Sequence, residues 1–89
     1  MDKRKLKKLI MDYLVDQEEY NTYTKAEKKY IADVFKTIMD SIYLAIKHQN
    51  VIPVILTRDV DTQMVVADAL SRLMEFIPTV GKVRVALIN

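Results

Sequence analysis

The chain has 89 residues, of which 51% are hydrophobic and 29% charged, and it contains no cysteine and a single glycine. This length corresponds to one domain over residues 1–89, and the apolar content excludes a disordered chain. The absence of cysteine excludes a disulfide scaffold, a CxxC redox site and a cysteine zinc site. The longest stretch without Asp, Glu, Lys or Arg is His48–Thr57, which is about half of the ~20 residues that a membrane span requires. We therefore expect a soluble, cytoplasmic protein with no membrane partner.

The net charge of +2 is too small to indicate a nucleic-acid partner by itself, but the charges are unevenly distributed. Residues 1–8 carry five positive charges and one negative charge. Four carboxylates with no compensating base follow between residues 12 and 19. The five cations are a candidate site for nucleic acid or for an acidic partner, and they are Lys3, Arg4, Lys5, Lys7 and Lys8.

The first helix is indicated by apolar residues that recur at three- and four-residue steps from Leu6 to Leu14. No glycine or proline occurs before Pro53, so we expect one helix over residues 2–19. Its cations would lie at the positive N-terminal end of the helix dipole, and its carboxylates at the negative C-terminal end. Either packing of the apolar face outweighs this small penalty, or the basic end binds an anion or an acidic partner.

The second helix has a clear start signal. Thr24-Lys25-Ala26-Glu27 matches a capping box, in which the Thr hydroxyl and the Glu carboxylate satisfy the first free amides. A wide apolar stripe then continues as far as the charged end at Lys47. We expect a helix over Lys25–Lys47 that folds back on the first helix, giving an antiparallel helical hairpin over residues 1–49.

Residues 50–89 are predicted to form a β-α-β unit. Val51–Leu56 is a short, continuous apolar run that is typical of a strand buried on both faces. Helical spacing returns over Val60–Ile77, and Pro78 is expected to end that helix. Val83–Ile88 alternates with a period of two, which predicts a strand with residues 83, 85 and 87 on the core side. Because a crossover helix connects the two strands, we expect them to be parallel.

The sequence therefore predicts a helix-dominated α+β fold with the element order ααβαβ. The N-terminal antiparallel helical hairpin packs on the C-terminal β-α-β unit. Parallel sheets normally have both faces covered, so we expect the hairpin to cover one face and the third helix the other. The core is expected to include Phe35, Ile38, Ile42 and Leu70.

The second predicted strand is a candidate association surface. Val83–Ile88 contains no proline and one charge, and an exposed edge of this kind pairs readily with another chain. Either the rest of the fold covers this edge, or a second copy pairs with it. We expect a homo-oligomer, most simply a dimer, whose interface residues are Val83, Val85 and Ile88.

The turn between the first strand and the third helix is a candidate anion site. A helix N-terminus offers free amides to a phosphate, and Arg58 would add donors beside Thr57. However, no glycine lets a phosphate approach the backbone, and Asp59 or Asp61 could cap the same amides. An ordinary capped helix start is therefore the favoured interpretation, and Thr57 and Arg58 are the candidate anion-binding residues in the alternative one.

No motif in the chain is typical of an enzyme. His48 is the only histidine, and no glycine-rich loop, metal-ligand spacing or nucleophile motif occurs, so we expect no catalytic residue, metal or cofactor. The sequence favours a small, non-catalytic binding or regulatory protein that acts by protein–protein contact as a homo-oligomer. The alternatives are a nucleic-acid-binding protein that uses the basic N-terminal helix, and a protein that binds a phosphorylated small ligand between subunits.

Overall fold

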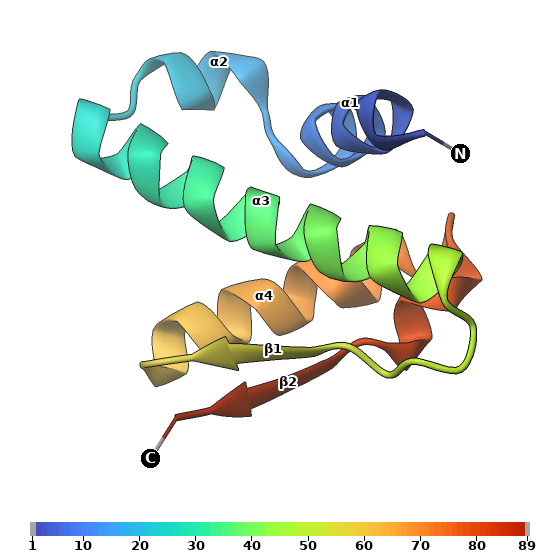
Figure 1. Cartoon of the computed structure of the whole chain (residues 1–89). Coiled ribbons are helices and arrows are strands. Elements are labelled where there is room, and N and C mark those ends of the chain that lie inside the picture. Colours follow the sequence, from blue (N-terminus) through green and yellow to red (C-terminus); the bar gives the residue numbers. More distant parts are fainter. Residues whose placement is uncertain (1, 89) are drawn as a thin grey trace.

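The computed structural model describes residues 2–88, except for the side chain of Gln17. It confirms the α+β class and the ααβαβ order, with one additional short helix in the first connection. The elements are α1 (Lys3–Leu14), α2 (Gln17–Asn21), α3 (Lys25–Lys47), β1 (Val54–Thr57), α4 (Val60–Leu73), the 3₁₀ helix η1 (Pro78–Lys82) and β2 (Arg84–Leu87), as drawn in Figure 1. Within residues 2–88, no helix combines the length and the apolar character needed to cross a membrane.

The first predicted helix is in fact two helices, so the prediction of one helix over residues 2–19 is wrong. α1 ends at Leu14, and the carboxylate of Asp16 accepts hydrogen bonds from the amides of Glu18 and Glu19 at 2.9 and 3.3 Å. A side chain that bonds to nearby amides in this way favours a new helix start over continuation of the old one. Glu18 and Glu19 therefore lie in the first turn of α2, where the helix dipole favours anions.

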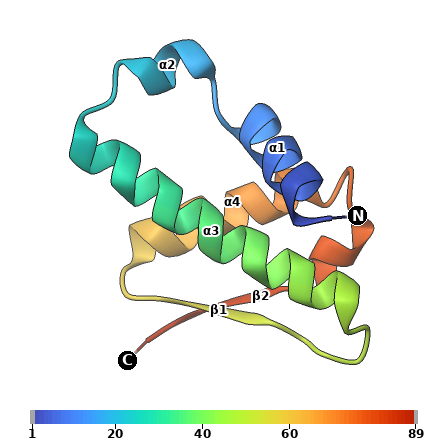
Figure 2. The same cartoon turned by 45° about the horizontal axis from the view of Figure 1, so that its top comes forward.

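α3 has the predicted bounds, and both hydrogen bonds of its capping box are present. The Thr24 hydroxyl accepts from the Glu27 amide at 3.1 Å, and the Glu27 carboxylate accepts from the Thr24 amide at 3.0 Å. α1 and α3 run in opposite directions and form the expected antiparallel hairpin, as Figure 2 shows. An ion pair of 3.3 Å between Lys3 and Asp40 joins the start of α1 to the second half of α3.

β1 and β2 form a two-stranded parallel sheet in which Ile55 lies opposite Val85. β1 begins after Pro53. The prediction that this strand is buried on both faces is wrong. Ile55 is 3% exposed, whereas Val54 and Leu56 are 53% and 62% exposed. α3 contacts β1, and α4 contacts both strands. Both helices therefore cover the same face of the sheet, and the expectation that the hairpin and the third helix cover opposite faces is wrong.

The third long helix, α4, ends four residues before the predicted boundary at Ile77. Proline clashes with a helical residue directly before it, which explains why Ile77 takes a non-helical conformation. Pro78 then opens η1, where its fixed φ angle suits the first turn of a helix. The chain reaches β2 through η1 instead of through a simple turn.

The core lies where α1, α3, α4, η1 and the inner face of the sheet meet. Ile38, Ile42 and Leu70 are buried as predicted, but Phe35 is only half-buried, because it lines a hollow beside α1. The buried apolar residues are Leu6, Ile10, Val34, Ile38, Ile42, Ala45, Ile55, Val66, Ala69, Leu70, Leu73, Ile77, Val80 and Val83.

Candidate functional site

The outer edge of β2 carries backbone groups that point away from the sheet. The amides of Arg84 and Ile88 donate to the carbonyls of Pro53 and Thr57, at 2.9 and 2.8 Å, on the β1 side of β2. Successive residues of a strand direct their backbone groups to opposite sides. The N–H and C=O groups of Val85 and of the next alternate residue, Leu87, therefore face away from β1. Such an edge is a template for pairing with another strand.

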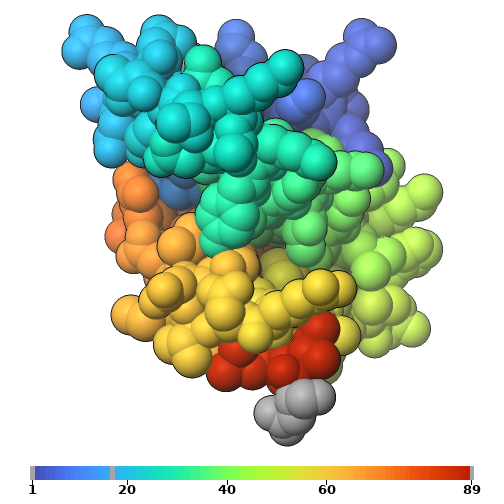
Figure 3. Space-filling model, turned by 90° about the vertical axis from the view of Figure 1, so that its left-hand side faces the viewer, coloured from blue at the N-terminus to red at the C-terminus, as the bar shows by residue number. Residues whose placement is uncertain are grey.

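An apolar stripe on α4 runs beside this edge. The exposed residues Val60, Met64, Ala67, Ser71 and the C-cap residue Met74 follow each other at steps of three and four, so they share one face of the helix, and all but Ser71 are apolar. Met64 is 64% exposed and Met74 is 47% exposed. In the space-filling view, the yellow surface formed by the β1–α4 turn and the start of α4 lies directly against β2 (red) (Figure 3). We call these five residues the α4 stripe.

A groove of about 330 Å³ separates the α4 stripe from β2 and is called here the β2–α4 groove. Residues of α4 form one wall of the groove, and residues of η1 and β2 form the other. The lining residues are Ala67, Leu70, Ser71, Met74, Val80, Gly81, Val83, Arg84 and Val85. The chain thus places a free strand edge next to an apolar helix wall, which is the arrangement that accepts an added strand in many recognition domains.

The three predicted interface residues lie in different environments. The Val83 side chain is 6% exposed and belongs to the core. Val85 is half-buried on the inner face of the sheet, and Ile88 is 50% exposed on the outer face. The edge itself is therefore presented by backbone atoms. Sequence reasoning did not find the α4 stripe, although the apolar residues of Val60–Met74 cover more of the helix than one buried face requires.

The outer face of the sheet is apolar and exposed. It carries Ile52, Val54, Leu56 and Ile88, which are 50% to 64% exposed. The Arg84 side chain starts from the same face and donates to the Gly81 carbonyl at 2.6 Å. Contiguous apolar patches of this kind are typical of protein–protein contact sites.

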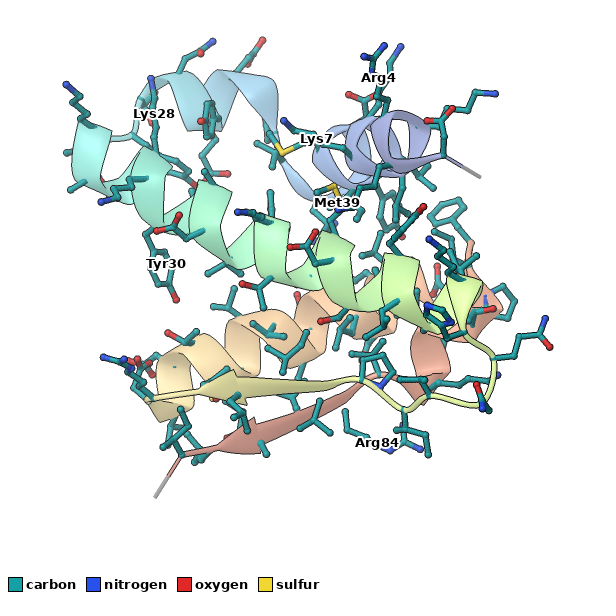
Figure 4. All side chains as sticks on the ribbon, in the orientation of Figure 1. Arg4, Lys7, Lys28, Tyr30, Met39 and Arg84 are labelled. Carbon is teal, nitrogen blue, oxygen red and sulfur yellow. The ribbon has the colours of Figure 1, made fainter. Side chains whose placement is uncertain are left out.

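The predicted basic site lies on α1, and all five of its cations are exposed. Lys3 is paired with Asp40 and also lies over the ring of Tyr43, 5.3 Å from its centroid. In Figure 4, Arg4 points away from α3, whereas Lys7 extends from α1 toward α2. The five charges therefore do not form one flat cationic surface, because helical spacing distributes them around α1.

The predicted anion site is largely occupied by the chain itself. The Thr57 side chain is buried and its hydroxyl donates to the Ala86 carbonyl at 3.1 Å. The Asp59 carboxylate accepts from the amide and the hydroxyl of Thr62 at 2.7 and 3.1 Å. These two hydrogen bonds lower the pKa of Asp59 below its ordinary value, and the bond from the amide has the larger effect. Of the two predicted residues, Arg58 alone remains exposed to solvent.

In residues 2–88 no group of three or more His, Cys, Asp or Glu side chains is placed to hold a metal ion. Comparison with known proteins gives no relative: no family model, no curated protein and no solved structure matches the chain.

Proposed function

We propose that this protein is a non-catalytic binding protein that acts by protein–protein contact as a homodimer. The observation that supports this proposal best is the open edge of β2 beside the exposed α4 stripe. An unpaired edge and an unpaired apolar helix face are each unfavourable in water, and here they are adjacent. One partner subunit would cover both.

In the proposed dimer, the β2 strands of two copies pair in antiparallel orientation across a two-fold axis. Val85 and Leu87 of each copy supply the N–H and C=O groups, so that two two-stranded sheets become one four-stranded sheet. The two α4 helices then lie side by side on the inner face of the joined sheet. Their stripes meet, which removes Met64 and Met74 from water.

The joined sheet supports a role in binding a further protein. Its outer face would bring two sets of Ile52, Val54, Leu56 and Ile88 onto one surface, together with Arg84 of each copy. Neither β2–β2 pairing nor α4 packing covers that surface, since both occur elsewhere on the subunit. A partner protein with an apolar contact face fits it.

Molar mass measured by light scattering during gel filtration tests the dimer. The wild-type protein should have twice the 10.4 kDa mass of the chain. Met64→Lys places a charge on the α4 stripe and should give a folded monomer. Val65→Lys is the matched control, because Val65 is exposed on the same helix but lies off the stripe. A monomeric wild-type protein at high micromolar concentration, or a Met64→Lys variant that stays dimeric, would contradict the proposed interface.

Nucleic-acid binding through α1 is the second candidate, and the exposed cations Arg4 and Lys8 favour it. Phosphate contacts release counterions, so affinity should fall on the order of a hundredfold between about 50 and 200 mM salt. Arg4→Gln with Lys8→Gln should remove binding. Lys25→Gln with Lys29→Gln removes the same charge from α3 and should leave binding unchanged. Binding to DNA or RNA that is insensitive to salt would exclude this candidate.

A further inference from the structure

A second and larger hollow, of about 510 Å³, lies between α1, α2 and α3. The nearly inaccessible Ile10 borders it on the α1 side, and half-buried apolar or aromatic side chains form half of its lining. In Figure 4, Met39 projects from α3 toward α1. The lining residues of this hollow, called here the three-helix groove, are Lys7, Ile10, Met11, Tyr20, Ile31, Ala32, Asp33, Phe35, Lys36 and Met39.

The local fold explains why the groove exists. The chain leaves α1 after Leu14, and the Asp16 cap starts α2 in a new direction. Tyr20 on α2 thereby becomes a third wall beside α1 and α3. A continuous helix to residue 19 would not have enclosed this space. The volume falls within the range of about 300–1,000 Å³ that is typical of small-molecule sites.

Two cations from facing helices lie on the groove. Lys7 belongs to α1 and Lys36 to α3, and both are exposed. Among residues 2–88, the one ion pair within 4.0 Å joins Lys3 and Asp40, so neither groove lysine is paired with a carboxylate. Asp33 is the one carboxylate of the lining, which leaves the groove with a net positive charge.

We propose that the three-helix groove binds a small amphipathic anion, namely an apolar hydrocarbon chain that ends in a carboxylate. The carboxylate would lie between the ammonium groups of Lys7 and Lys36. The hydrocarbon chain would lie against the apolar side chains of α3, which extend from Ile31 to Met39 over about 12 Å at 1.5 Å per residue. Met11 and Met39 suit this role, because the flexible thioether side chain adapts to the shape of an apolar ligand.

Isothermal titration with decanoate, below its micelle concentration, tests the proposal. The wild-type protein should bind decanoate and should bind decyltrimethylammonium, which has the same chain and the opposite charge, at least tenfold more weakly. Lys7→Gln with Lys36→Gln should weaken decanoate binding at least tenfold. Lys8→Gln with Lys29→Gln removes the same charge outside the groove and should leave the affinity within twofold of wild type.

A third variant tests the location. Ala32 is exposed and lines the groove, so Ala32→Trp should fill it and abolish decanoate binding while the circular dichroism spectrum stays unchanged. Equal affinity for both probes, no binding of decanoate, or binding that survives Ala32→Trp would overturn the proposal. Binding of an acidic helical peptide without binding of decanoate would overturn it in favour of a protein partner. Met64→Lys should bind decanoate like wild type, because this site is independent of the proposed dimer.

Discussion

Both faces of the sheet carry apolar side chains, but the inner face is buried and the outer face is exposed to solvent. Ile55 points to the inner face and is 3% exposed, while its neighbour Leu56 points to the outer face and is 62% exposed. The difference arises because α3 and α4 both pack on the inner face. Apolar composition therefore does not identify the core of this protein. An apolar side chain stabilises the fold on one face and is available for contact on the other.

The largest effect that separates the two faces is expected from alanine substitutions at adjacent positions of β1. Ile55→Ala leaves a cavity under α3 and α4 and should lower the free energy of unfolding by about 2–5 kcal/mol. Leu56→Ala removes an exposed side chain and should change it by less than about 0.5 kcal/mol. Urea denaturation of both variants measures the difference. Similar losses in the two variants would show that the outer face is covered within the monomer.

The next largest effect concerns the start of α3, one of the two helices that cover the inner face. Thr24→Ala removes the hydroxyl that accepts from the Glu27 amide, and it should lower the free energy of unfolding by about 1 kcal/mol. Thr22→Ala is a control, because the Thr22 hydroxyl donates to the Glu19 carbonyl and caps no amide of α3. Equal losses of unfolding free energy in the two variants, measured by urea denaturation, would contradict a specific role for the capping box.

The pH dependence of stability tests the starts of both covering helices. Hydrogen bonds from Thr24 lower the pKa of Glu27, and those from Thr62 lower the pKa of Asp59. Groups with a lowered pKa in the folded state stabilise it above their ordinary pKa values, and this contribution is lost as pH falls through the folded values. Stability should therefore decline below the ordinary values of 4.5 and 3.8.

A double variant isolates these two groups. Glu27→Gln with Asp59→Asn keeps side-chain oxygens at both helix starts but does not titrate. Its unfolding free energy, measured by urea denaturation between about pH 5 and pH 3, should decline less steeply than that of the wild type. Parallel curves for the two proteins would assign the acid sensitivity to other carboxylates.

The smallest effect is expected at the surface ion pair between α1 and α3. Lys3 and Asp40 are both about half exposed, so Lys3→Gln should change the free energy of unfolding by less than about 0.5 kcal/mol. Thermal melts at low and high salt measure this. A loss of 2 kcal/mol or more, on the order of a core truncation, would mean that the ion pair helps to hold α1 over the inner side of the molecule.

Local signals predicted the fold best. The start of α3 follows from the Thr24–Glu27 capping box, its end from the extent of the apolar stripe, and the last strand from the alternation after Val83. The break after α1 also has a local signal in the sequence. Asp16 with Glu19 three residues later resembles a helix start, but the absence of glycine and proline suggested continuation.

Features that depend on tertiary packing could not be predicted. The run from Val51 to Leu56 is apolar at every position, so it contains no alternation that distinguishes a covered face from an exposed one. The alternation of Val83–Ile88 predicts a strand edge, but apolar spacing on α4 does not separate the exposed α4 stripe from the buried face beside it. The three-helix groove depends on the direction of α2, which no periodicity reveals.

The central claim, that β2 pairs with a second copy, is tested most directly by amide hydrogen exchange at several protein concentrations. The amides of Val85 and Leu87 should exchange slowly at high micromolar concentration and faster on dilution, because they are bonded only in the dimer. The amides of Val54 and Leu56 face the opposite edge of the sheet and should show no dependence on concentration. Identical exchange of Val85 and Leu87 at every concentration would contradict the pairing.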